Sequence, residues 1–145
     1  MKTIWPLAAV ALALIAGPAA AENWHRFAAS RTTAYLADTD SIGPTGDEIG
    51  IRVAKVATSG AAGDRSHSVD QFVFRCAAGQ VRSILSIEYG TDGTESDRFD
   101  DSEAPWDDVV ENSYLDTLRR LTCDGTPARE NNWPSIIAFI DGGRS

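Results

Sequence analysis

Residues 67–89, HSVDQFVFRCAAGQVRSILSIEY, carry the strongest structural signal in the chain. Apolar and polar residues alternate through residues 67–76, so that Phe72 and Phe74 fall on one face and Arg75 on the other. Ala77–Gly79 then has the length of a hairpin connection, with glycine where a positive φ is needed. Residues 80–89 predict the returning strand, whose apolar side chains are expected to share one face: Val81, Leu85, Ile87 and Tyr89.

A second alternating pattern covers residues 49–57. The faces of this strand are expected to carry Ile49, Ile51 and Val53 on one side and Gly50, Arg52 and Ala54 on the other. Residues 24–29 and 33–37 predict two further strands, each shorter and less regular than this one.

Short polar segments separate the predicted strands. We predict a turn at Asp38–Ser41, because aspartate and serine side chains hydrogen-bond to their own backbone. Gly43–Asp47, Gly60–Asp64 and Gly90–Gly93 provide further turn signals. Short strands joined by turns predict an antiparallel meander of five or six strands.

A helix is predicted over residues 113–121, with Asn112 or Ser113 as its cap. Its apolar stripe consists of Tyr114, Leu118 and Leu121. This helix is expected to lie on the sheet, so the fold class is α+β with a flanking C-terminal helix.

Residues 126–145 form a tail that is not purely polar. Its apolar residues are Trp133, Ile136, Ile137, Phe139 and Ile140. Pro134 suits the first turn of a short helix, with Asn132 as cap and Gly142–Gly143 as the end. We expect the tail to pack on an open sheet face; an exposed partner-binding helix and a disordered tail are the alternatives.

Residues 1–21 have the pattern of a secretory signal peptide. Met1–Lys2 provides a basic start, and the apolar run Leu7–Ala16 is too short to span a bilayer. Ala19–Ala21 places small residues for cleavage before Glu22. The protein is therefore expected to be periplasmic or secreted and to have no transmembrane segment, with an uncleaved anchor as the alternative.

Two cysteines, Cys76 and Cys123, lie beyond the predicted leader. An even number of cysteines in an exported protein favours one disulfide over free thiols or intermolecular bridges. Their separation excludes a C-x-x-C redox motif, and no histidine–cysteine cluster suggests zinc.

The formal net charge is −8 at pH 7, and loss of Lys2 with the leader would lower it by one more. So negative a chain repels phosphate backbones, which argues against nucleic-acid binding. Residues 92–111 contain nine acidic residues and one base, Arg98. This density predicts a solvated loop or edge; a calcium site or attraction to a basic protein are alternatives.

Catalytic motifs are weak. Asp38–Asp40 has a D-x-D form, but the magnesium phosphotransferases that use it need a parallel sheet, whereas this chain has hairpin patterns. His25 and His67 are the only histidines, and no G-x-S-x-G elbow accompanies them. We therefore predict no catalytic residues, no metal site and no cofactor.

The candidate ligand-binding residues are aromatic and acidic. Trp24, Trp106 and Trp133 could form a recognition surface, because tryptophan is enriched among interface anchors. Asp107 and Asp108 follow Trp106 directly and join it as candidates.

The order of features resembles the surface-adhesin protein E family of proteobacterial envelope proteins. The residues that carry the resemblance are Trp24, Tyr35–Asp38, Asp40–Ile42, Asp70–Cys76, Arg82, Tyr89, Trp106–Val109 and Cys123. The resemblance implies an antiparallel sheet flanked by a helix, a bridge between Cys76 and Cys123, and a binding role. Haem binding and binding of host proteins are associated with that family. The leader here lacks a lipid-attachment cysteine, and Lys55 is the only lysine after it.

Together these features predict a leader over 1–21, a domain over 22–125 and a tail over 126–145. The predicted function is an exported, adhesin-like binding module, not an enzyme, that recognises a protein or small ligand at the cell envelope. A protein partner is expected, a basic one being an option. Two alternatives are an acidic inhibitor of a basic enzyme such as lysozyme and a haem- or metal-binding envelope protein.

Overall fold

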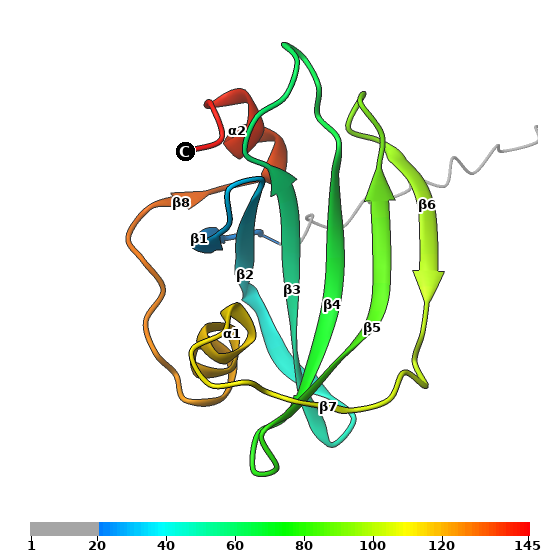
Figure 1. The fold of residues 1–145 in the computed structure, drawn as a ribbon, viewed down its shortest axis with the longest axis vertical. Coiled ribbons are helices and arrows are strands. Elements are labelled where there is room, and N and C mark those ends of the chain that lie inside the picture. The colour runs from blue at the N-terminus through cyan, green and yellow to red at the C-terminus, as the bar shows by residue number, and fades with distance from the viewer. Residues whose placement is uncertain (1–20) are drawn as a thin grey trace, which may run out of the picture.

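The computed structural model describes residues 21–145, so the predicted leader lies outside the described residues except for Ala21. The chain forms one antiparallel sheet of eight strands, more than the five or six predicted. The strands are β1 (Trp24–Ala29), β2 (Thr33–Thr45), β3 (Glu48–Ala57), β4 (His67–Arg75), β5 (Gln80–Tyr89), β6 (Glu95–Asp100), β7 (Asp107–Asp108) and β8 (Asn132–Trp133). Their order is β6-β5-β4-β3-β2-β1-β8, and β7 pairs with β5 (Figure 1).

The three strands absent from the prediction are at the margins of the sheet. Every residue of β6 is exposed, which agrees with the prediction of a solvated edge for the acidic segment. Charged residues on an edge strand discourage pairing with another chain. β7 and β8 have two residues each, too few for an alternation pattern to be recognised.

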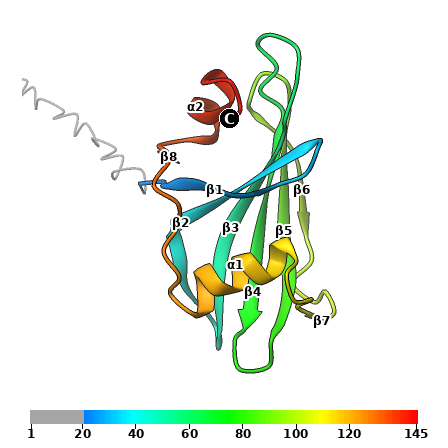
Figure 2. The same cartoon turned by 60° about the vertical axis from the view of Figure 1, so that its left-hand side comes forward.

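The two helices lie towards opposite ends of the strands, as Figures 1 and 2 show. α1 (Tyr114–Cys123) confirms the predicted helix, and the Ser113 hydroxyl caps it by accepting the Asp116 N–H at 3.2 Å. α2 (Ile136–Asp141) lies in the tail, where Ser135 caps it by accepting the Ala138 N–H at 3.0 Å.

The prediction that Asn132 caps the tail helix is therefore wrong, because Asn132 belongs to β8. Trp133 and Asn132 pair with Trp24 and His25 of β1, which extends the sheet by one short strand. Ile136, Phe139 and Ile140 are buried, so the tail packs on the sheet as expected.

Both faces of the sheet carry buried residues in β2 and β3. Adjacent residues point to opposite faces, and adjacent pairs are both buried: Leu36 and Ala37 in β2, Val53 and Ala54 in β3. One core contains Leu36 and Ala54 together with α2, and the other contains Val53 together with α1. The predicted alternation of residues 49–57 is confirmed, but both faces carry core residues because a helix lies on each.

The predicted disulfide is present. Cys76 and Cys123 are bonded across 47 positions of the sequence, with Cα atoms 5.7 Å apart. Cys76 directly follows β4, and Cys123 is the last residue of α1. The bond therefore holds the end of the helix on the sheet.

The predicted turn at Asp38–Ser41 is wrong, because β2 continues through it. The pairing with β3 jumps from Asp38↔Arg52 to Gly43↔Gly50, so β2 accommodates extra residues as a bulge. Within the bulge the Ser41 hydroxyl accepts the Arg52 N–H at 2.8 Å and takes the place of a backbone acceptor.

A second irregularity changes the predicted face of β5. Leu85 pairs with Gln71 and Ser83 pairs with Phe72, so one additional residue stands in β5. The bulge reverses the alternation, so Val81 lies in the core beneath α1 instead of sharing a face with Leu85 and Ile87. A pattern of period two cannot reveal a single inserted residue.

Candidate functional site

The face of the sheet on which α2 lies is open beyond that helix. Its cross-strand rows follow from the register: Arg52–Gln71–Leu85 and then Gly50–Val73–Arg82. Gln71, Arg82 and Leu85 are only half-buried. We refer to the part of this face formed by Gln71 and Arg75 of β4 and by Gln80, Arg82 and Leu85 of β5 as the open face.

Two arginines and a tryptophan meet on the open face. The pairing of Val81 with Asp107 places Trp106 beside Arg82. The guanidinium carbon of Arg75 lies 4.1 Å from the centre of the Trp106 ring, and that of Arg82 lies 4.5 Å from it. Such cation–π contacts fix the guanidinium groups against the indole. We call these three residues the arginine–tryptophan cluster.

The positive charges of the cluster are poorly neutralised. Arg82 donates from Nη1 to the Ala104 carbonyl at 3.1 Å, whereas its buried Nε has no hydrogen-bond partner within residues 21–145. Arg75 Nε is 3.8 Å from a Glu48 carboxylate oxygen, near the limit of an ion pair. Two adjacent guanidinium groups with one distant carboxylate offer several N–H donors to an incoming carboxylate.

The predicted site residues Asp107 and Asp108 form β7, beside the cluster. Both are exposed. Asp108 accepts a hydrogen bond from the Gln80 amide at 3.3 Å. Asp108 therefore lies at the rim of the open face and gives it a negative border, whereas Asp107 pairs with Val81, whose side chain is on the opposite face.

The other two predicted tryptophans lie at the opposite edge of the sheet from Trp106. Trp24 and Trp133 are cross-strand neighbours on β1 and β8. Trp24 is 1% exposed, and Trp133 packs edge-on against Phe139 with ring centres 4.9 Å apart. The three tryptophans thus do not form one surface: Trp24 belongs to the core beneath α2, and Trp133, partly buried, packs against that core.

A groove lies between α2 and the sheet, on the same face as the cluster. Its volume is about 190 Å³, and its apolar lining includes Trp24, Val69, Ile87, Tyr89, Ile136 and Ile137. Arg52 also lines it, but this guanidinium pairs with Asp38 and with Glu22. The charge of Arg52 is therefore already compensated, unlike that of Arg82.

The D-x-D aspartate and the histidines have local hydrogen-bond partners. Asp38 accepts the N–H groups of Asn23 at 3.0 Å and Asp40 at 3.2 Å, in addition to pairing with Arg52. His25 and His67 are buried, and Nδ1 of each bonds to a backbone carbonyl. Burial lowers the pKa of His67 below its ordinary value, although its bond to the Arg65 carbonyl opposes this.

A polar cluster lies on the other face of the sheet. Asp70 pairs with Lys55 and accepts the Ser86 hydroxyl at 2.6 Å. Tyr114 stacks on Tyr35 nearby, with ring centres 4.7 Å apart, and burial raises the pKa of Tyr114. Both oxygens of Asp70 are engaged, so this group stabilises the contact between β3, β4 and β5.

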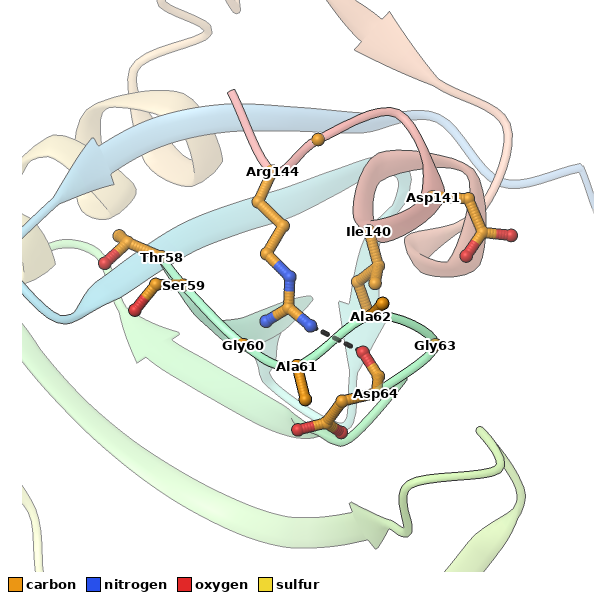
Figure 3. A pocket seen from close by; sticks show the side chains of 11 residues that line it. Thr58, Ser59, Gly60, Ala61, Ala62, Gly63, Asp64, Ile140, Asp141 and Arg144 are labelled. Carbon is orange, nitrogen blue, oxygen red and sulfur yellow. Dashed lines mark hydrogen bonds between the residues drawn. The ribbon is translucent and has the colours of Figure 1, made fainter.

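A larger hollow beside the loop 58–64 is organised by Arg144 (Figure 3). Its guanidinium donates to the Ala57 carbonyl at 2.9 Å and to the Asp64 carbonyl at 2.5 Å. Gly60 lies against the same guanidinium, where a Cβ would approach it to 2.7 Å. Arg144 therefore links the C-terminal end of the chain to the loop 58–64 by hydrogen bonds.

Sequence reasoning did not identify Arg75 and Arg82 as candidate site residues. The alternation of residues 67–76 places Arg75 on the face opposite Phe72 and Phe74, which was a usable signal. Its meeting with Arg82 and Trp106 depends on the β5 bulge and on the pairing of β7, which no local pattern reveals.

No family model, curated protein or solved structure matches this chain. Within residues 21–145, neither helix combines the length and the apolar character needed to cross a membrane. The same residues contain no group of three or more histidine, cysteine, aspartate or glutamate side chains arranged to hold a metal ion.

Proposed function

We propose that this chain is an exported, adhesin-like binding module that recognises a protein partner at the cell envelope through the open face. The observation that carries the proposal is the arginine–tryptophan cluster. Arginine and tryptophan are the residues most enriched at the centres of protein interfaces. Here the Trp106 ring orients the guanidinium groups of Arg75 and Arg82 before any partner arrives, which reduces the entropic cost of binding.

The absence of catalysis in this proposal is supported by the hydrogen bonds that the candidate catalytic side chains make to the protein backbone. The carboxylate of Asp38 and the Nδ1 atoms of His25 and His67 have structural partners. A general base or nucleophile needs a free group aimed at a substrate.

Export is supported by the leader pattern and by the Cys76–Cys123 disulfide, since disulfides persist in oxidising compartments. Mass analysis of the protein purified from the cell envelope tests this part. We expect a mature chain that begins at Glu22, whereas a chain that retains residues 1–21 contradicts cleavage at Ala21.

Photo-crosslinking in cells that export the chain tests the binding surface. A photoreactive amino acid is placed at Asp108, at the rim of the open face, and in a second variant at Thr117, which is exposed on α1. We expect a discrete adduct from position 108 and none from position 117.

The adduct should disappear when Arg75 and Arg82 are both changed to glutamine. The matched control, Arg31→Gln with Arg129→Gln, removes the same charge from two exposed positions elsewhere and should retain the adduct. Loss of the adduct in both double variants would mean that the net charge of the protein, and not the arginine–tryptophan cluster, determines binding. A basic protein that is captured regardless of Arg75 and Arg82, and released by salt, would instead support the inhibitor alternative.

A further inference from the structure

The groove beneath α2 and the arginine–tryptophan cluster lie on one face of the same strands. Val69 lines the groove, and Val73 pairs with Arg82 at the cluster. These positions are four residues apart on β4, which is about 13 Å in an extended strand. Residues four apart on a strand also point to the same side.

The surface between the two features is accessible. Gln71 and Leu85 form the intervening cross-strand pair, and both are half-buried. They offer one amide and one apolar side chain to a segment that lies along the strands.

The two ends of this surface favour different chemistry. The groove is lined mainly by apolar side chains, and its one guanidinium, Arg52, has carboxylate partners in Asp38 and Glu22. An aliphatic side chain can therefore be buried there without displacing an ion pair. At the other end the Arg75 side chain is 47% exposed and its carboxylate neighbour, Glu48, is 3.8 Å away, so an incoming carboxylate gains hydrogen bonds there.

Resting on the binding function proposed above, we propose that the occupant of this face is an extended segment of a partner protein. The segment carries an aliphatic residue that enters the groove and an aspartate or glutamate four positions away that binds Arg75 and Arg82. An extended segment matches the spacing of the groove and the cluster, because two of its residues four positions apart lie about 13 Å from each other and point to the same side.

One acidic residue fits this surface better than an acidic run. Glu48 and Asp108 border the cluster, and the whole chain has a formal charge of −8. Additional carboxylates on the segment would meet these negative charges, whereas a single carboxylate is surrounded by N–H donors.

The test uses short synthetic peptides with leucine, a glutamate four positions later, and glycine, serine or threonine elsewhere. The probe is titrated into the isotope-labelled protein and followed by NMR at the Trp106 indole N–H and at the methyl groups of Ile87 and Ile137. We expect both regions to shift together with one dissociation constant. Two control peptides replace the glutamate by glutamine or move it to three positions after the leucine, which turns it to the other side.

The protein variants Arg82→Gln and Ile137→Ala should each weaken binding by about tenfold, because each removes one of the two anchors. Arg31→Gln should leave it unchanged, and the dispersion of each spectrum reports whether the variant is folded. Binding of either control peptide as tightly as the probe, or shifts confined to one region, would overturn the proposal. Crosslinking at position 108 is independent of these peptides, so the binding function and the ligand class can fail separately.

Discussion

Lys55 and Asp70 form an ion pair of 2.5 Å between β3 and β4, on the face of the sheet where α1 lies. The two partners differ in burial: the Asp70 side chain is 6% exposed and that of Lys55 is 35% exposed. Burial lowers the pKa of Lys55, but its hydrogen bond to Asp70 and the charge of Asp70 outweigh this, so the pKa is raised. Loss of one partner should therefore affect the stability of the protein differently from loss of the other, because only Asp70 would remain buried without a counter-charge.

Removing the lysine should cost more than removing the aspartate. Lys55→Met leaves a buried carboxylate whose remaining partner is Ser86, and we expect a loss of about 3 kcal/mol. Asp70→Asn leaves an ammonium group that can reach water, and we expect a loss of about 1 kcal/mol. Urea unfolding at pH 7 measures both; a smaller loss for Lys55→Met than for Asp70→Asn contradicts the argument.

The same pair predicts a loss of stability in alkali. Because the folded-state pKa of Lys55 is raised, its contribution is fully present below about pH 10.5 and is lost as the pH rises through the folded value. Tyr114, whose pKa is also raised, adds to the loss, since the unfolded chain releases that proton first. Unfolding midpoints between pH 9 and pH 11.5 should fall less steeply in Lys55→Met than in the unchanged protein.

His67 predicts an opposite dependence at lower pH. Its pKa is lowered by burial, so below about pH 6.5 the unfolded chain binds a proton that the folded chain does not. Stability should therefore fall as the pH decreases from 7 towards 5. His67→Phe keeps a ring to stack on Tyr89, where the centres are now 4.4 Å apart, and should reduce this slope. An unchanged slope in urea titrations of the variant would assign the loss to other groups.

The disulfide should account for a large part of the stability. It closes a loop of 47 residues, which corresponds to about 4 kcal/mol in the chain-entropy model. Changing Cys76 and Cys123 together to serine should lower the free energy of unfolding by about this amount. Reductant should destabilise the unchanged protein to the same degree and have no effect on the double variant; sensitivity of the variant to reductant would contradict a disulfide origin.

α2 should be held by its apolar contacts more than by its ion pair. Phe139 is fully buried against Trp133, and Phe139→Ala should cost about 3–5 kcal/mol. Asp141 pairs with Arg65 at 2.8 Å, but both side chains are over 40% exposed, so Asp141→Asn should cost less than about 1 kcal/mol. Thermal unfolding compares the two variants, and equal losses would mean that the ion pair anchors the helix.

Prediction from sequence succeeded where the signal was local. The alternation of residues 49–57, the capping of α1 by Ser113 and the exposed acidic edge depend on neighbours in the chain, and the structure contains all three. It failed where pairing decided the outcome. Asp38–Ser41 has the composition of a turn, yet the Ser41 hydroxyl and the pairing of Asp38 with Arg52 retain it in β2 as a bulge.

The candidate site marks the same division. The sequence by itself determined that Arg75 points away from Phe72 and Phe74, that a helix follows the acidic segment, and that two cysteines are available to join helix and sheet. Only the tertiary structure decided that Arg82 and Trp106 lie beside Arg75, and that Trp24 is in the core with Trp133 packed against it. The physical reason is that side-chain alternation is encoded residue by residue, whereas the register between strands arises from bulges and edge pairings that are set when the whole sheet packs.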